Sequence, residues 1–343
     1  MLSGKNVLVT GGAGSIGRSL VPHLLSHDPS VVRVLDNSEP ALSGAGSRFD
    51  DDRLRYFAGD IRDRPRLDRA IEDVDVVIHL AAMKHVDISE YNPFEAVKTN
   101  VLGLQNAIDA SIDASVERFL FTSSDKAVDP ANTMGTTKLL GEHLVRGGNK
   151  YSGRPNISLA CVRFGNVINS SHSVVPLFDD QIRAGGPVTL TDDRMTRFFL
   201  TFEDIAGLVT DALEHMQAGE VFLRRMDAIR IEDLAAAMVD ILAPRYGHDP
   251  GSVEIELIGK RLGETLHEEV VTEREAGRLV ANDDLYAVLP ETTDGDGFID
   301  HDGLEGFSRP EEVVRSSGRT ETLDRAEVEA FVEQHVVPEV VDD

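Results

Sequence analysis

The sequence contains little cysteine and no apolar run of membrane-spanning length. A single cysteine among 343 residues excludes an internal disulfide, and we expect Cys161 to be a small buried strand residue. No apolar stretch approaches the roughly 20 residues of a membrane span, and the first residues lack the basic and then apolar pattern of a leader. The eleven histidines are not expected to form a metal cluster. We therefore expect a soluble, cytoplasmic protein with no membrane partner and no metal.

Basic side chains are also scarce. Thirty-four Lys and Arg against sixty Asp and Glu give a net charge of −26, which would repel nucleic acid and anionic lipid. Only seven of the basic residues are lysine. Such a surface suits a high-salt, halophilic cytosol, because dissolved ions screen its self-repulsion; an ordinary acidic protein is the alternative. The remaining lysines are then enriched where an amine is needed, as at Lys84, Lys126 and Lys138.

Short β-branched runs alternate with amphipathic helical stretches through the first half of the chain. This alternation predicts an α/β fold, a Rossmann-type doubly wound parallel sheet. From about residue 170 the pattern changes to short mixed elements, which predicts a smaller C-terminal lobe. We place the first domain at residues 1–168, with a return strand near 220–224, and the second mainly at 169–343. The expected strands are residues 6–10, 31–35, 54–57, 74–80, 119–122 and 157–162.

A glycine-rich segment follows the first expected strand. Glycines there allow a tight turn and close approach of a pyrophosphate to backbone N–H groups at a helix N-terminus. The second strand ends in Asp36, at the spacing where a carboxylate accepts from an adenosine ribose. The pattern predicts dinucleotide binding, with NAD favoured because Asp36 would repel a 2′-phosphate, although Arg33 leaves NADP possible. The expected cofactor contacts in the loop are Gly11, Gly14, Ser15, Ile16 and Gly17.

The third and fourth strands end in residues that could also meet the cofactor. Asp60, followed by Ile61, could bond the adenine amine, and the small Ala81 and Ala82 could let the chain pass under the cofactor. A strand-end cap or plain packing is the alternative for each. Because ligands of such sheets sit at the carboxyl ends of the strands, the regular placement of these residues favours the ligand interpretation.

The segment after the fifth strand carries Ser124, Asp125, Lys126, Met134 and Lys138. It resembles the extended short-chain dehydrogenase/reductase superfamily, in which a serine or threonine follows this strand and a Tyr-x-x-x-Lys pair lies on the next helix. Positions i and i+4 share one helix face. Met134 stands at the tyrosine position, and a thioether cannot exchange a proton as a phenol does. Alcohol oxidation or 4-epimerisation by the usual route is therefore in doubt.

Further motifs narrow the resemblance. Ser-Asp-Lys-Ala-Val precedes Met134, and the chain carries A-M-K-H-V from residue 82, K-T-N-V-L-G from 98, R-F-G-N-V from 163 and G-K-R-L-G-E from 259. The sequence is similar to the inverting UDP-N-acetylglucosamine 4,6-dehydratases of capsule- and flagellin-type polysaccharide biosynthesis. It departs from them at residues 171–172 and at Thr265, so the sugar or the base could differ.

The resemblance implies a lyase reaction without net redox change. Hydride leaves C4 of the sugar, a base removes the C5 proton, an acid assists loss of the C6 hydroxyl as water, and the same hydride returns to C6. It implies Ser124 and Lys138 beside the C4 oxygen, Asp125 as the C6 acid and Lys126 as the C5 base. Lys138 or a water is left to take the C4 proton, because Met134 is inert. A structural Asp125–Lys126 pair is the alternative.

The resemblance also implies contacts outside this segment. Asn100 and Lys84 would join Lys138 in binding the cofactor, and Arg261 and Glu264 would hold a phosphate and the uridine ribose. A helix-capping salt bridge is the alternative for Arg197. The full set of expected substrate contacts is Lys84, His85, Asn166, Val174, Thr189, Arg197, Arg261 and Glu264.

Three points complete the sequence interpretation. Residues 294–300 are similar to a calcium loop, but two ligand positions do not fit, which favours an acidic solvated loop. The resemblance implies a homo-oligomer, a dimer or higher, paired through helices at residues 93–112 and 133–145. A nucleotide-sugar epimerase and a non-catalytic dinucleotide-binding protein are the alternative functions.

Overall fold

The structure is a computed structural model that describes residues 1–151, 153, 157–170, 173–261, 263–291 and 304–337. The departures at residues 171–172 and the calcium-like segment 294–300 lie outside these residues. The chain divides into two compact units, which we describe separately. The first comprises Met1–Phe164, Phe202–Arg225 and Thr272–Val313, and the second comprises Gly165–Thr201, Met226–Val271 and Val314–Asp343.

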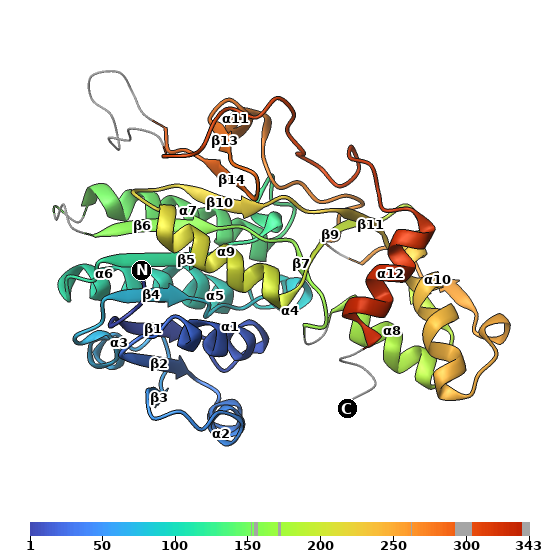
Figure 1. Ribbon diagram of the computed structural model, residues 1–343, viewed down its shortest axis with the longest axis horizontal. Coiled ribbons are helices and arrows are strands. Elements are labelled where there is room, and N and C mark those ends of the chain that lie inside the picture. Colours follow the sequence, from blue (N-terminus) through green and yellow to red (C-terminus); the bar gives the residue numbers. More distant parts are fainter. Residues whose placement is uncertain (152, 154–156, 171–172, 262, 292–303, 338–343) are drawn as a thin grey trace. The chain divides into compact units, whose positions relative to one another are not determined.

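The first unit is built on a nine-stranded sheet (Figure 1). Seven strands run parallel in the order β3-β2-β1-β4-β5-β6-β10, and β14 and β13 extend the β10 edge antiparallel. This arrangement confirms the predicted Rossmann-type fold. The strands are β1 Asn6–Thr10, β2 Val31–Asp36, β3 Leu54–Ala58, β4 Val76–His79, β5 Arg118–Thr122, β6 Ser158–Val162, β10 Val221–Arg224, β13 Leu279–Ala281 and β14 Leu285–Val288.

Helices cover both faces of this sheet, which explains the nearly continuous apolar sequence of its central strands. α1 and α9 pack together on one face, while α3, α6 and α7 lie on the other (Figure 1). The helices are α1 Ser15–Ser26, α2 Glu39–Arg48, α3 Arg64–Ile71, α4 Val86–Tyr91, α5 Pro93–Val97, α6 Leu104–Asp113, α7 Thr133–Tyr151, α9 Phe202–His215 and α11 Glu273–Ala276, with the π-helical η1 Lys98–Gly103 and the short 3-10 turn η2 Asp125–Ala127.

Two features of the first unit differ from the sequence prediction. The helix expected over residues 93–112 is divided into α5, η1 and α6. The expected boundary at 168/169 is also displaced: the first unit ends its first segment at Phe164 and regains residues 202–225 and 272–313. The reason is the sheet itself, because β10 pairs with β6 and the β13–β14 hairpin pairs with β10.

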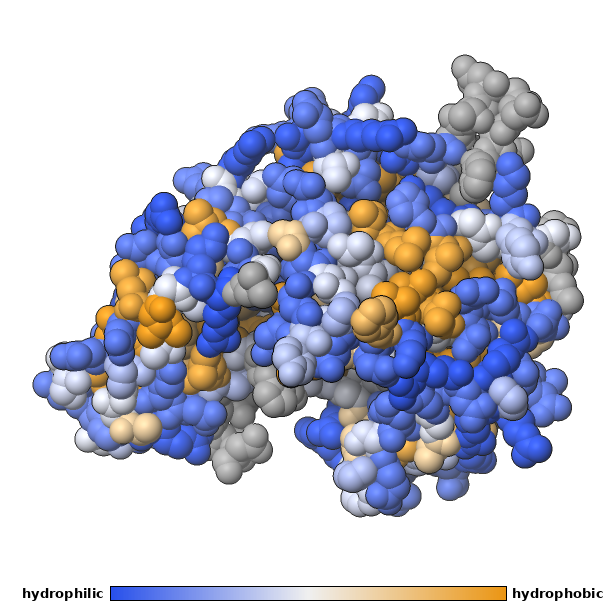
Figure 2. Space-filling model, turned by 180° about the vertical axis from the view of Figure 1, so that it is seen from behind, coloured by the Kyte–Doolittle hydropathy of each residue, from blue (hydrophilic) through white to orange (hydrophobic). Residues whose placement is uncertain are grey.

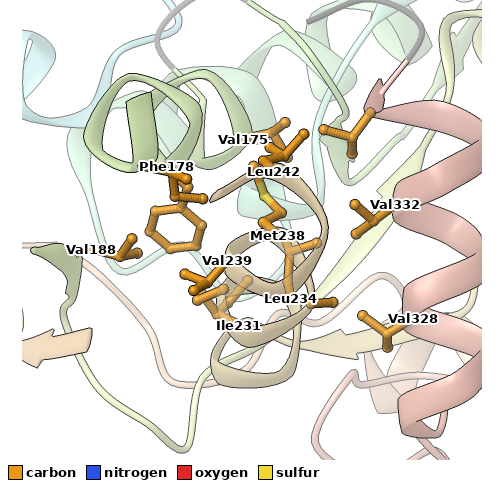
Figure 3. Close-up of a cluster of buried hydrophobic side chains, with 14 of the residues drawn as sticks. Val175, Phe178, Val188, Ile231, Leu234, Met238, Val239, Leu242, Val328 and Val332 are labelled. Atoms are coloured by element: carbon orange, nitrogen blue, oxygen red, sulfur yellow. The ribbon is translucent and has the colours of Figure 1, made fainter. Parts of the chain in front are cut away.

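The second unit has two small sheets and a helical core. β9 Thr196–Leu200 pairs with β7 Asn166–Val167 and β11 Ala228–Arg230, and β8 Val188–Leu190 pairs with β12 Ile255–Leu257. Phe178 of α8, Met238 of α10 and Val332 of α12 meet in one buried cluster (Figure 3). The helices are α8 Val174–Arg183, α10 Ile231–Leu242 and α12 Arg325–His335, with 3-10 turns η3 Ala243–Tyr246 and η4 Pro250–Ser252.

Candidate active site

The glycine loop between β1 and α1 has no room for side chains. Gly11 has φ +68°, and a Cβ there would lie 2.7 Å from the Ala81 backbone. A Cβ on Gly17 would lie 2.3 Å from the Gly12 carbonyl oxygen. The Gly14 amide donates to the Gly11 carbonyl at 3.1 Å, and Gly14 is the N-cap of α1. The loop therefore brings the N-terminus of α1, with Ser15 and Ile16, close to the end of β4, as a pyrophosphate cradle requires.

Asp36 at the end of β2 is held against this loop. Its Oδ2 accepts from the Ala13 amide at 3.1 Å and its Oδ1 from the Ser38 amide at 3.0 Å. The carboxylate retains lone pairs that can accept ribose hydroxyls. Arg33, the residue that left NADP open, donates through Nη1 to the carbonyls of Ala70 and Glu72. Its guanidinium is thus engaged at the C-terminal end of α3.

The ends of β3 and β4 contribute mainly backbone and packing. Asp60 is bound by Arg62 at 2.6 to 3.0 Å, and this hydrogen bonding lowers the pKa of the Asp60 carboxyl. Ile61 is buried against Gly103 of η1. The Ala81 backbone lies under Gly11, and Ala82 follows it at partial exposure. Asp60 is therefore paired with Arg62 at the end of β3. Ala81 lies directly beside Gly11 of the glycine loop.

Asn100 of η1 holds the segment after β4. Its Oδ1 accepts from the Met83 amide at 2.8 Å, and its Nδ2 donates to the Met83 carbonyl at 3.0 Å and to Thr137 Oγ1 at 2.9 Å. Asn100 is 2% exposed, so these protein contacts fix the chain just before Lys84. Partial burial of its amine lowers the pKa of Lys84, and His85 is the N-cap of α4.

Asp125, the carboxylate of the expected reacting centre, is buried, at 1% exposure. Its Oδ1 accepts from Ser124 Oγ at 2.7 Å, from the Lys126 amide at 2.8 Å and from Lys126 Nζ at 3.1 Å. Its Oδ2 is buried and has no hydrogen-bond partner among the described residues. The structure therefore contains the Asp125–Lys126 ion pair, and one oxygen of that carboxylate is left to meet a ligand.

Met134 and Lys138 lie one turn apart on α7 and are both buried, at 3% and 6% exposure. The backbone of α7 presses against the turn that carries Lys126, since a Cβ on Gly135 would lie 2.0 Å from the Lys126 carbonyl oxygen. Only glycine fits between them. This close contact brings α7 to residues 124–126.

Lys138 donates from Nζ to the Thr122 carbonyl at 2.8 Å and lies 4.8 Å from the centre of the Phe121 ring. Burial lowers the pKa of Lys138 to about 8, and the negative charge of Glu142 acts in the opposite direction. His79 of β4 lies nearby, and burial, with a smaller effect from Lys138, lowers its pKa to about 3. His79 is therefore neutral, and its Nδ1 is bonded to Thr10 Oγ1 at 2.9 Å.

A buried ionic network was missed in the sequence. Arg163 binds Glu142 through Nε at 2.7 Å and Nη2 at 2.6 Å, and it binds Glu275 at 2.7 and 3.0 Å. Ser123 Oγ donates to Glu142 Oε1 at 2.6 Å. The available signal was the position of Glu142, one helical turn after Lys138, and of Arg163, directly after an apolar strand.

Arg197 in the second unit has a protein partner for each of its five N–H groups. Nε meets Glu268 at 3.3 Å, and the four Nη donors go to neighbouring main-chain and sulfur atoms. These partners leave no donor for a phosphate, and Glu268 does not belong to the following helix, α9, that the capping alternative names. The Nη partners are the carbonyls of Thr196, Leu266 and Thr265 and the sulfur of Met195.

The other expected substrate contacts of the second unit lie in several elements. Thr189 of β8 is bound at both its amide and its hydroxyl by Gln181, at 3.0 and 2.8 Å. Glu264 Oε2 accepts from the Arg261 amide at 2.9 Å, so the two residues share one turn. Asn166 lies in β7, and Val174 is the first residue of α8.

The described residues contain neither a metal-binding cluster nor a membrane-spanning helix. No trio of His, Cys, Asp and Glu side chains there is arranged to hold a metal ion. His23 and His27 pair at 3.3 Å at the end of α1 without a third ligand of this kind in that part of the chain. Within the same residues, none of the helices has both the length and the apolar character to cross a membrane.

Comparison with curated proteins gives relatives along most of the chain. A Methanocaldococcus jannaschii protein named an uncharacterized membrane protein is 48% identical over 85% of this chain and 87% of its own length. A UDP-N-acetylglucosamine 4,6-dehydratase (inverting) from Campylobacter jejuni is 39% identical over 84% of each chain. A Rickettsia massiliae protein named UDP-glucose 4-epimerase is 35% identical over 84% of each.

Solved structures show the same fold. Pen from Bacillus thuringiensis matches with a TM-score of 0.87 at 35% identity, over 97% of this chain and 98% of that one. The dTDP-glucose 4,6-dehydratase DesIV from Streptomyces venezuelae, solved with NAD bound, matches with a TM-score of 0.69 at 26% identity, over 85% and 94%. The NAD-bound neighbour supports dinucleotide binding by this chain.

The family comparison covers most of the chain. Residues 7–290 match the family described as polysaccharide biosynthesis protein, and this match confirms the resemblance seen in the sequence motifs. The chain therefore belongs to this polysaccharide biosynthesis family of extended short-chain dehydrogenases/reductases, whose members here include nucleotide-sugar dehydratases and epimerases.

Proposed function

We propose that the protein is an NAD-dependent nucleotide-sugar 4,6-dehydratase that acts on UDP-N-acetylglucosamine, inverts C5 and serves surface-glycan biosynthesis. The observation that carries this proposal is the Asp125–Lys126 pair with its buried, unpartnered Oδ2. A dehydratase needs an acid at C6 and a base at C5, whereas an epimerase needs proton exchange at C4 only. Met134 cannot exchange that proton, but a dehydratase must release the C4 proton too, so it is the acid and the base for C6 and C5 that separate the two reactions.

The residues around the glycine loop fit a dinucleotide. Gly11, Gly14 and Gly17 leave space where a Cβ would meet backbone, and the N-terminus of α1 offers amides to the pyrophosphate. Asp36 would accept from the adenosine ribose and Lys138 would bind the nicotinamide ribose. Bound NAD would supply the hydride acceptor for C4 and the donor for C6. NAD is favoured over NADP because Asp36 would repel a 2′-phosphate and Arg33 is engaged elsewhere.

Asp125 and Lys126 can supply the acid and the base from one shared proton. Moving the proton from Lys126 Nζ to Asp125 Oδ1, across their 3.1 Å hydrogen bond, turns the ion pair into a carboxylic acid and a neutral amine. The acid then protonates the departing C6 hydroxyl, and the amine removes the C5 proton. When hydride has returned to C6, a proton from solvent must be added back to C5, and inversion requires that it arrive on the opposite face of the sugar ring.

Lys138 and Ser124 would act at the sugar C4 oxygen. An ammonium group in a buried site stabilises negative charge that develops on that oxygen, an effect worth a few kcal/mol. Ser124 Oγ can turn from Asp125 to donate there. The C4 proton is assigned to a water, since the ammonium form of Lys138 has no lone pair to accept it.

The nucleotide end of the substrate is assigned to the second unit. Arg261 would hold a phosphate and Glu264 the uridine ribose, with Asn166, Val174 and Thr189 as further contacts. Lys84 and His85 of the first unit would contact the sugar or the diphosphate. Arg197 is proposed instead to shape residues 265–268, because its donors are already bound.

A mass measurement tests the proposal. The protein is incubated with NAD and UDP-N-acetylglucosamine in concentrated KCl, and the product is weighed. Loss of one water supports the dehydratase, and proton NMR of that product reports C5 configuration. An isomer of unchanged mass supports the epimerase that the Rickettsia relative's name suggests. Unchanged substrate supports a non-catalytic dinucleotide-binding protein.

A further inference from the structure

Three charged side chains are buried behind the reacting centre. Glu142 and Arg163 are 0% and 1% exposed, and Glu275 is 8% exposed. Each carboxylate receives two hydrogen bonds from Arg163, which is the strongest arrangement for such a pair. Although burial opposes both charges, this contact raises the pKa of Arg163 and lowers the pKa of Glu275 to about 2. Arg163 and Glu275 are therefore charged at neutral pH.

Stability alone does not explain this network. Removing each charge from water costs several kcal/mol, and packed apolar residues in the same space are often as stable or more stable. The network also lies at one particular place, the carboxyl ends of β5 and β6. A role in the geometry or the field of the neighbouring reacting groups accounts for both facts.

Glu142 and the two chain neighbours of Arg163 contact the turn that carries the acid and the base, residues 123–126. Ser123 Oγ donates to Glu142 Oε1 at 2.6 Å. The Ser123 amide donates to the Val162 carbonyl at 2.7 Å and the Asp125 amide to the Phe164 carbonyl at 3.2 Å. Arg163 lies between these two carbonyls in the chain. Displacing Arg163 or Glu142 would therefore move the turn.

Glu142 also faces Lys138 from one helical turn away on α7. The other groups around the Lys138 amine are His79 from β4, the Phe121 ring and Thr122 carbonyl from β5, and Cys161 from β6. His79 is neutral, and burial raises the pKa of the Cys161 thiol, which is neutral too. Glu142 brings the negative charge to this group of side chains.

We propose that Glu142 is a positioning residue of the reacting centre: held by Arg163, it fixes Ser123 and the 123–126 turn and places a negative charge beside Lys138. Glu275 holds the opposite side of Arg163 from α11 and serves as the matched control. The kinetic part of this inference rests on the proposed function. The effect of Glu142 on the Lys138 titration midpoint does not depend on the proposed function, because that midpoint can be measured without substrate.

The test compares Glu142→Gln with Glu275→Gln in protein labelled at lysine Cε. Seven lysines give few NMR signals, and Lys138→Arg identifies one of them. We expect Glu142→Gln to lower the Lys138 titration midpoint by about one pH unit, because a neighbouring negative charge is lost. Its kcat for loss of water should fall at least about tenfold, with NAD affinity within about twofold, since misplacement affects the chemical step first. Glu275→Gln should leave the Lys138 midpoint unchanged.

Two results would overturn the proposal. One is a Glu142→Gln protein with the wild-type midpoint and kcat, and the other is an equal change in Glu275→Gln. If Glu142→Gln does not fold, Ser123→Ala breaks only the bond to the turn: a lower kcat with an unchanged midpoint supports positioning, and an unchanged kcat refutes it. Should the wild-type protein remove no water, the dehydratase assignment fails, and the Lys138 midpoints alone decide whether Glu142 acts on that amine.

Discussion

Lys126 is the residue whose loss most directly tests the acid–base assignment. Lys126→Ala removes the C5 base and leaves Asp125 without its cation, so dehydration should fall by about a hundredfold or more. NAD affinity should stay close to wild type, because the amine contacts Asp125 rather than the glycine loop. Single-turnover product analysis and NAD titration measure the two effects. Lys150→Ala, a change distant in sequence on the C-terminal turn of α7, is the control, and retained turnover in Lys126→Ala would remove it from the mechanism.

Lys138 makes a prediction about pH. Burial lowers the pKa of its amine to about 8, so the ammonium form dominates below pH 8 and is lost as the pH rises through that value. If the positive charge is what the C4 oxygen needs, kcat/KM should decrease above pH 8. A pH–rate profile in concentrated KCl measures this limb. An increase through pH 8 would instead identify the neutral amine as the C4 base.

For single residues, the sequence predicts contacts between side chains that are close in the chain better than contacts between side chains that are far apart in it. The Asp125–Lys126 pair and the i, i+4 relation of Met134 and Lys138 follow from local spacing. Glu142 and Glu275 lie 21 and 112 positions from Arg163, so their meeting depends on the fold. Each resembles an ordinary surface charge until β6, α7 and α11 are in place.

The glycine loop and the end of β2 lie side by side, because Asp36 of β2 accepts a hydrogen bond from the Ala13 amide in the loop. Asp36→Ala should weaken NAD binding by roughly tenfold and NADP binding by less, since a carboxylate hydrogen bond to the ribose is lost while repulsion of a 2′-phosphate is relieved. Isothermal titration with both dinucleotides gives the ratio. Arg33→Ala is the control, because its guanidinium donates to Ala70 and Glu72. Equal losses for both dinucleotides in Asp36→Ala would count against the ribose contact.

The central strands are the elements that sequence predicts well. β1, β4 and β5 are buried on both faces, so their apolar runs are continuous and unmistakable. The β13–β14 hairpin has strands of three and four residues at an antiparallel edge, and so short a pattern carries little signal. The π-helical turn η1 was missed because its apolar spacing differs little from that of an α-helix over six residues.

One patch on the whole molecule suits a second copy of this chain. Ile88, Tyr91, Phe94, Val97 and Leu140 are exposed apolar residues of α4, α5 and α7, and Figure 2 shows hydrophobic side chains gathered on this side of the first unit. Since contiguous exposed apolar surface marks interaction sites, we expect a dimer. Phe94→Glu with Tyr91→Glu should shift sedimentation to the monomer, whereas Tyr151→Glu is the control. An unchanged sedimentation coefficient would contradict this assignment.

The net charge of −26 makes the stability of the whole molecule sensitive to salt. Between about 0.1 and 1 M salt the screening length falls from roughly 10 to 3 Å, which removes most self-repulsion among surface carboxylates. The Tm should therefore rise steadily with KCl over this range. Differential scanning calorimetry measures it, with sucrose as an uncharged control. A Tm that is flat or falls in KCl would argue for an ordinary acidic protein.

The β13–β14 hairpin has a practical consequence for anyone who wishes to shorten this protein. A fragment ending at Phe164 would keep the glycine loop, the acid and the base, yet it would lose β10, both hairpin strands and the α11 carboxylate that faces Arg163. The cut would expose β6 as an unpaired apolar edge strand, and Arg163 beside it would keep Glu142 but lose Glu275. No single truncation point therefore yields a stand-alone nucleotide-binding half, and gene fusions should be made at the termini.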